Sequence, residues 1–150
     1  MIGGLLYLAV LLAVLLYVER SKEREPRIAI WTLVIASLMT LGAVLSGSTF
    51  HFASALLTGL DFLVLAVFLG HALKSRFYWT LCLPALQLLT CMTHITKFAA
   101  PDILSRVYSV GQGFWAYPQL FVILLAAIWA KSAREAGRRA VDGGDGAGAP

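Results

Sequence analysis

The chain has 150 residues, of which 59% are hydrophobic and only 13% are charged. A soluble domain carries about 25% charged residues, so an ordinary water-soluble globular domain is excluded. The formal net charge of +4 comes from Lys and Arg residues in short segments between apolar runs. That distribution reflects orientation in a membrane and does not indicate nucleic-acid binding. The composition predicts an all-α integral membrane protein.

Five apolar runs predict a bundle of five transmembrane helices in a single membrane domain, residues 1–130. The first run follows Met1 directly, without the positive charge that opens a cleavable signal peptide, so it is predicted to remain as a helix. From Ile28 onward, 33 residues lack Lys, Arg, Asp and Glu, which is too long for one span, and the Ser/Gly cluster at 46–52 marks the break. The predicted spans cover residues 2–18, 28–46, 53–73, 77–97 and 114–130.

Two further segments lie outside these spans. In the stretch 101–110 (PDILSRVYSV), apolar residues recur at helical spacing, which predicts a short amphipathic helix at the membrane interface before the last span. Residues 131–150 are first basic and then rich in Gly, Asp and Ala. Because that composition offers nothing to bury, it predicts a disordered tail.

The positive charges predict an orientation. With five spans, the segments 19–27, 74–76 and 131–150 lie on one side of the membrane and carry ten Lys and Arg residues. The other side carries only Lys97 and Arg106. By the positive-inside rule, the N-terminus lies outside and the C-terminus lies in the cytoplasm.

The fourth predicted span, 77–97, carries a polar stripe. At 100° per residue, its members fall within an arc of about 120°. Pro84 is expected to kink this helix, because it frees the carbonyl group of Thr80. A polar stripe on a membrane helix needs a polar partner. The stripe consists of Thr80, Pro84, Gln87, Thr90, Cys91 and His94.

The predicted partner is Asp61, the only acidic residue inside a predicted span. A central Asp costs about 3 kcal/mol on insertion scales, which the many Leu, Val and Phe residues of the same span outweigh. The three-residue turn at 74–76 predicts that the third and fourth helices are antiparallel neighbours, with Asp61 level with Gln87 and Thr90. The sequence therefore predicts a polar pocket in the outer half of the membrane, formed by Asp61, Gln87, Thr90, His94, Thr58 on the face of Asp61, and His51 near the mouth.

Two interpretations of this cluster stay open. It is either an interhelical hydrogen-bond clamp or a site for a proton relay or a small ligand. His94 or Lys97 is the candidate cation that would keep Asp61 ionised. Without CxxCH, HExxH or a second acid nearby, we expect no metal or cofactor. No catalytic nucleophile stands out, and an enzyme is not expected.

The stretches Tyr78-Trp79, QLLT (87–90), Thr93-His94 and GFWAYPQL (113–120) resemble a pattern in small uncharacterised multi-pass inner-membrane proteins of proteobacteria. The resemblance covers residues 77–120. It implies residence in a bacterial inner membrane and no particular activity.

These observations predict a non-enzymatic membrane protein, an accessory or assembly subunit of a membrane complex. Its expected partners are the lipid bilayer and another membrane protein or further copies of itself, but no nucleic acid. The alternative is a small transporter or proton-coupled component that uses the cluster around Asp61. A membrane enzyme or cofactor-binding subunit is a weaker third possibility.

Overall fold

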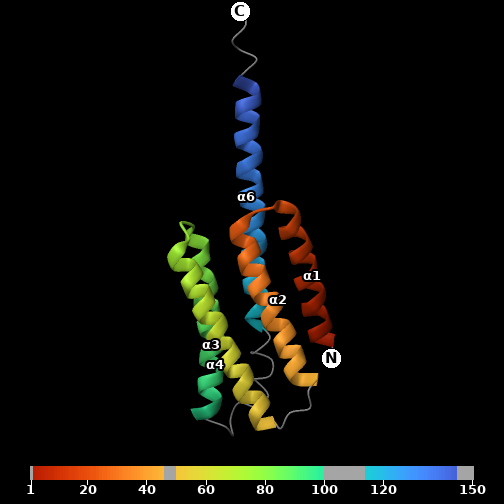
Figure 1. Ribbon diagram of the computed structural model, residues 1–150, viewed down its shortest axis with the longest axis vertical. Helices are drawn as coiled ribbons and strands as arrows, with labels where there is room; N and C mark the ends of the chain where they lie inside the picture. The colour runs from red at the N-terminus through yellow and green to blue at the C-terminus, as the bar shows by residue number, and fades with distance from the viewer. Residues whose placement is uncertain (1, 46–49, 100–113, 145–150) are drawn as a thin grey trace, which may run out of the picture.

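The computed structural model describes residues 2–45, 50–99 and 114–144, and these ranges are helical with short turns and no strand (Figure 1). The predicted all-α class is confirmed. The elements are α1 (Ile2–Ser21), α2 (Arg24–Leu45), α3 (Phe50–Lys74), the 3₁₀ turn η1 (Tyr78–Leu81), α4 (Cys82–Ala99) and α6 (Ala116–Gly144).

Four of the described helices are long and apolar enough to cross a membrane. The helix α4 is not among them, because Gln87, His94 and Lys97 lower the mean hydropathy of its 18 residues. The predicted count of five spans is therefore not confirmed. The prediction of several apolar helices is confirmed. The four membrane-length segments are Gly4–Ser21, Arg24–Ala43, Ala55–Lys74 and Ala116–Ala140.

The helices pack as two hairpins and a long closing helix. The helix α1 pairs with α2, and α3 turns through η1 into α4 (Figure 1). The helix α3 also packs against α2, and α6 contacts α1, α2 and α4. All of these helices thus contribute to one apolar core, whose buried residues are Leu11, Val14, Val18, Ala29, Ile30, Leu33, Val64, Phe68, Leu83, Leu120, Ile123 and Ala127.

The outward faces of the helices are apolar as well. Helices that are hydrophobic all round are typical of proteins surrounded by lipid, since water would oppose so large an apolar surface. The outer surface is therefore compatible with membrane insertion. Side chains that are more than half exposed include Leu5, Leu38, Leu63, Leu73, Phe121 and Trp129.

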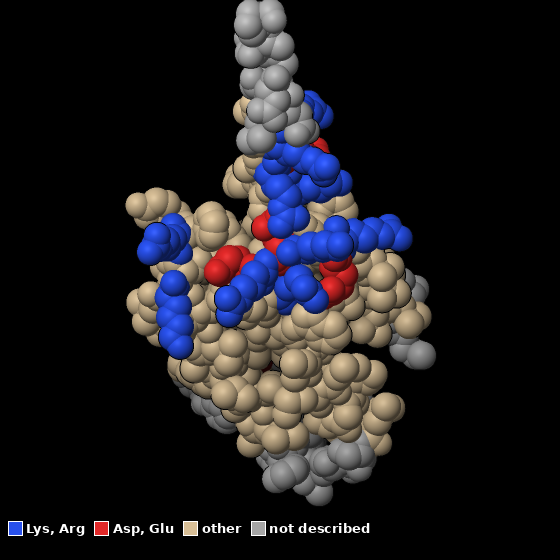
Figure 2. Space-filling view, turned by 45° about the horizontal axis from the view of Figure 1, so that its top comes forward, with Lys and Arg blue, Asp and Glu red and all other residues tan. Residues whose placement is uncertain are grey.

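Lys and Arg side chains gather at one end of the bundle, where α1 meets α2 and where α6 leaves the other helices (Figure 2). Glu19 accepts a hydrogen bond from Trp31 Nε1 at 2.8 Å and pairs with Arg27 at 3.0 Å. Arg134 pairs with Glu23 at 3.2 Å, which connects α6 to the turn between α1 and α2. Ion pairs thus link three helices at this basic end.

The prediction of a disordered tail from residue 131 is wrong for residues 131–144, because α6 continues to Gly144. Its Ala, Arg, Lys and Glu residues are good helix formers, and Lys131 lies 3.9 Å from Glu135 one turn later. At 1.5 Å per residue, the 29 residues of α6 are about 43 Å long, more than the hydrocarbon core of about 30 Å. The predicted interfacial helix at 101–110 lies outside the described residues.

Pro84 does not kink a continuous helix as expected. The helix α4 begins only at Cys82, so Pro84 lies in its first turn, where a missing backbone donor costs little. The preceding residues form η1, and Thr80 donates a hydrogen bond from its hydroxyl to the carbonyl of Phe77 at 2.6 Å. A change from 3₁₀ to α-helix replaces the kink.

Candidate functional site

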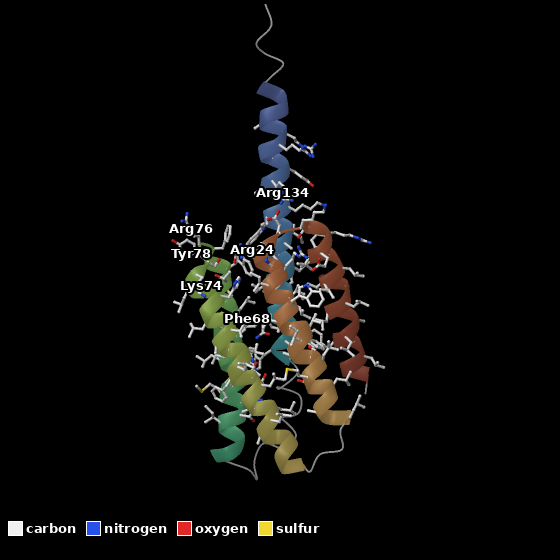
Figure 3. All side chains as sticks on the ribbon, viewed as in Figure 1. Arg24, Phe68, Lys74, Arg76, Tyr78 and Arg134 are labelled. Carbon is white, nitrogen blue, oxygen red and sulfur yellow. The ribbon has the colours of Figure 1, made fainter. Side chains whose placement is uncertain are left out.

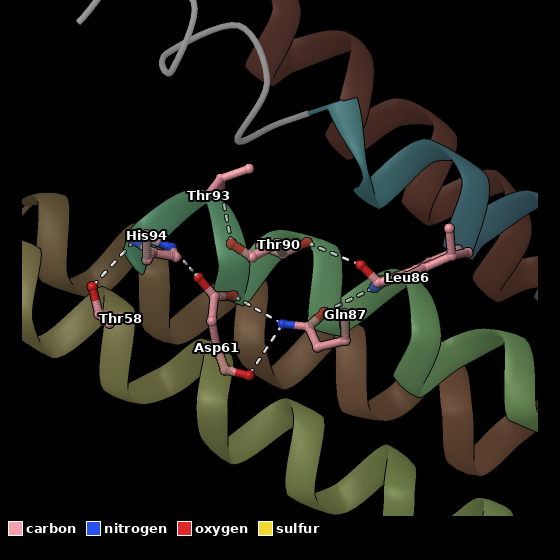
Figure 4. Close-up of polar contacts among 8 residues, drawn as sticks. Thr58, Asp61, Leu86, Gln87, Thr90, Thr93 and His94 are labelled. Carbon is pink, nitrogen blue, oxygen red and sulfur yellow. Dashed lines mark hydrogen bonds and ion pairs between the residues drawn. The ribbon is translucent and has the colours of Figure 1, made fainter. Parts of the chain in front are cut away.

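The hairpin of α3 and α4 brings Asp61 opposite the polar stripe of α4 (Figure 4). Asp61 precedes Lys74 by 13 residues, which places it about 20 Å along the helix from the basic end at 1.5 Å per residue. Gln87 and His94 lie two turns apart on one face of α4, because seven residues make nearly two full turns. Asp61 lies between these two side chains and contacts both.

Gln87 is the first of the two contacts. Its amide Nε2 donates to Asp61 Oδ1 at 3.1 Å and to the backbone carbonyl of Asp61 at 3.2 Å. The side chain is only 3% exposed, so its amide needs partners within the protein. The prediction that Gln87 neighbours Asp61 in depth agrees with this contact.

His94 is the second contact. Its Nε2 lies 2.7 Å from Asp61 Oδ2, and its Nδ1 lies 3.2 Å from the hydroxyl of Thr58, one turn before Asp61 on α3. The His94 side chain is 2% exposed and that of Asp61 is 26% exposed. Both ring nitrogens and both carboxylate oxygens are thus engaged, and the Asp61 side chain is partly exposed.

The network extends to a third helix through Gln119 of α6. Gln119 Nε2 donates to Gln87 Oε1 at 2.8 Å, and Gln119 is only 2% exposed. Sequence reasoning did not single out Gln119. The sequence does indicate it in one way. Gln119 is a lone amide within the apolar segment Ala116–Ala140, and such an amide needs a buried partner just as Gln87 does.

Thr90 is buried near the network but is bonded within its own helix. Its hydroxyl donates to the carbonyl of Leu86 at 3.4 Å, and the hydroxyl of Thr93 donates to the carbonyl of Thr90 at 2.6 Å. Such back-bonding is the usual role of hydroxyls in membrane helices. His51 lies in the first turn of α3, and its side chain is outside the described part of the chain. The structure therefore brings together Thr58, Asp61, Gln87 and His94, with Thr90 beside them.

The arrangement allows hydrogen bonding and proton exchange. Within the described residues, no group of three His, Cys, Asp or Glu side chains is placed to hold a metal ion. The carboxylate and the imidazole can each take up or release a proton, whereas the two amides only donate and accept hydrogen bonds. Both cysteines are free thiols, with Cys82 exposed and Cys91 buried in α4.

The variant Gln119→Leu is expected to reduce the free energy of unfolding by about 1 kcal/mol, because the buried Oε1 of Gln87 loses its donor. Reversible unfolding in mixed micelles measures the change. Thr32→Val is a suitable control, since the hydroxyl of Thr32 donates to Ile28 within its own helix. Equal losses in the two variants would show that the contact between α6 and α4 adds no stability.

No protein-family model matches the chain, and no curated protein or solved structure is significantly similar to it.

Proposed function

We propose that this protein is a non-enzymatic integral membrane protein that serves as an accessory or assembly subunit of a membrane complex. The observation that supports the proposal most directly is that the side chains of the hydrogen-bond network satisfy one another. The polar atoms of the side chains of Asp61, Gln87 and His94 each have a partner in α3, α4 or α6. A substrate would have to break these bonds, whereas a packing role needs them intact. In this proposal the network fixes the positions of three helices.

The apolar surface supports the assembly part of the proposal. Between 17% and 28% of the residues in the most apolar stretch of each of the four membrane-length segments are buried inside the protein. The remainder is available to lipid, to a partner subunit or to a second copy of the chain. Membrane helices associate through such surfaces by close packing and by occasional polar contacts.

The proposal includes five spans, an extracytoplasmic N-terminus and a cytoplasmic C-terminus in a bacterial inner membrane. The fifth span is α4 together with η1, whose polar stripe is covered by α3 and α6. The gathering of Lys and Arg at one end supports this orientation by the positive-inside rule (Figure 2). Of two reporters fused at Gly146, one active in the cytoplasm and one active in the periplasm, we expect only the cytoplasmic reporter to give a signal. A signal from the periplasmic reporter would contradict the orientation.

Purification of the full chain in mild detergent tests the assembly role. We expect a defined complex by size-exclusion chromatography with light scattering, and mass spectrometry should identify its subunits. A tag on any partner so identified should recover this chain in return at the same stoichiometry. A monomer without a stoichiometric partner would contradict the proposal.

A second candidate function is a small transporter or proton-coupled component. The specific observation in its favour is the 2.7 Å contact between Asp61 and His94, because it joins a partly exposed Asp61 side chain to a buried imidazole. Acidic and histidine side chains inside a membrane commonly carry protons. Asp61→Asn retains the size and hydrogen-bonding ability of Asp61 but cannot bind a transferable proton. Unchanged proton flux in this variant would rule the second candidate out.

A further inference from the structure

A second pair of a carboxylate and an imidazole lies at the basic end of the bundle. His71 of α3 places its Nε2 3.2 Å from Oε2 of Glu25 at the start of α2. The two atoms are buried, yet neither is in hydrogen-bonding geometry with any described residue. Buried polar atoms without such a partner are uncommon and call for an explanation. The two atoms are farther apart than those of the pair of Asp61 and His94, which lie 2.7 Å from each other.

One residue of each pair, Asp61 or His71, lies on the same face of α3. The residues Thr58, Asp61, Val64, Phe68 and His71 follow one another at spacings of three or four, which keeps them on one side of a helix. Asp61 and His71 are ten residues apart, or about 15 Å along the axis. Asp61 and His71 are thus polar positions on this face of α3, with Val64 and Phe68 between them.

An apolar layer separates the two pairs. Val64 is 5% exposed and Phe68 is 1% exposed, and both belong to the core that α1, α2, α4 and α6 share. Phe68 lies in the interior of the bundle, below Lys74 and Arg24 at the basic end (Figure 3). Charges and protons cross such a layer poorly because it removes their hydration.

We propose that the pair Glu25–His71 and the pair Asp61–His94 are two proton-exchange sites in series, and that Val64 and Phe68 form the barrier between them. The inference rests on the second candidate function, and it adds an inner site and a barrier to that function. A proton from water binds the Glu25–His71 pair, and water entering beside Phe68 carries it to the Asp61 carboxylate. Asp61, the more exposed member of its pair, holds the proton against His94 and releases it to water on the far side, with no transfer of electrons.

Each site has a facing group on a neighbouring helix. Glu25 of α2 faces His71, and His94 of α4 faces Asp61. The Cys91 thiol of α4 also interacts electrostatically with Asp61. The neutral amide of Gln87 donates to Asp61 but carries no proton onward.

The full chain in liposomes that contain a pH-sensitive dye tests the proposal, with a potassium diffusion potential set by valinomycin driving proton entry. We expect slow flux in the wild type, above that of protein-free liposomes. Phe68→Ala should raise the flux at least about tenfold, the factor by which a modestly lower barrier increases a rate. Val64→Ala should raise it in the same direction. Phe62→Ala removes an exposed phenyl ring from the same helix and should leave the flux unchanged.

The double variants identify the path. In the Phe68→Ala background, Asp61→Asn and His71→Gln should each return the flux to that of protein-free liposomes, with insertion checked by circular dichroism and gel filtration. If Asp61→Asn abolishes flux while His71→Gln and the two barrier variants have no effect, the second candidate function stands and the series path is wrong. If neither the wild type nor Phe68→Ala exceeds protein-free liposomes, both are contradicted.

Discussion

Asp61→Leu is expected to reduce the free energy of unfolding by about 2–4 kcal/mol, because it removes the acceptor of two buried donors at once. Gln87 Nε2 loses the carboxylate at 3.1 Å, and His94 Nε2 loses its partner at 2.7 Å. The Leu side chain brings no hydrogen-bonding group that could replace either contact. Reversible unfolding in mixed micelles, followed by circular dichroism, measures the loss.

Asp61→Asn is the matched control for this prediction. An amide at position 61 can accept a hydrogen bond from Gln87 and donate one to His94 Nε2. The imidazole proton of His94 then resides on Nδ1, which faces the Thr58 hydroxyl. We therefore expect a loss below about 1 kcal/mol. If Asp61→Leu were as stable as Asp61→Asn, the network would not act as a clamp.

Phe68→Ala is expected to cost about 3–5 kcal/mol, the range for deleting a fully buried phenyl ring. Phe68 is 1% exposed and lies in a core that α1, α2, α4 and α6 share with α3, so the neighbouring side chains cannot readily fill the space. The loss should appear in the same unfolding measurement.

Phe62→Ala provides the comparison, because Phe62 lies in the same helix but is 43% exposed. Lipid replaces most of the contacts of an outward-facing side chain, so we expect a change of less than about 1 kcal/mol. Similar losses in the two phenylalanine variants would mean that α3 is rotated about its axis relative to this packing.

Much of the site was predictable from the sequence because its parts are close together in the chain. The three-residue turn at 74–76 predicted that α3 and α4 are antiparallel, and the stripe on α4 predicted which face meets Asp61. Comparing the heights of residues along the two antiparallel helices then identified Gln87 as a neighbour of Asp61. His94 followed because it lies on the same stripe as Gln87. Local spacing and a short connection were sufficient for these residues.

The remaining features depend on contacts that local patterns do not encode. Gln119 reaches Gln87 from α6 across 32 residues, and no periodicity indicates that pairing. The inner pair of Glu25 and His71 similarly joins two helices whose relative rotation is set only by packing. The segment up to Gly144 has little to bury, and its helix depends on the helix propensity of its Ala, Arg and Lys residues, which hydropathy does not reveal.

A double-mutant cycle between Asp61 and His94 tests most directly whether α3 and α4 are held together by their polar contact. The cycle compares the unfolding free energies of Asp61→Leu, His94→Leu and the double variant with that of the wild type, all in the same mixed micelles. We expect the double variant to lose less stability than the sum of the two single losses, giving a coupling energy of about 1 kcal/mol. Additive losses, with a coupling energy near zero, would contradict the contact.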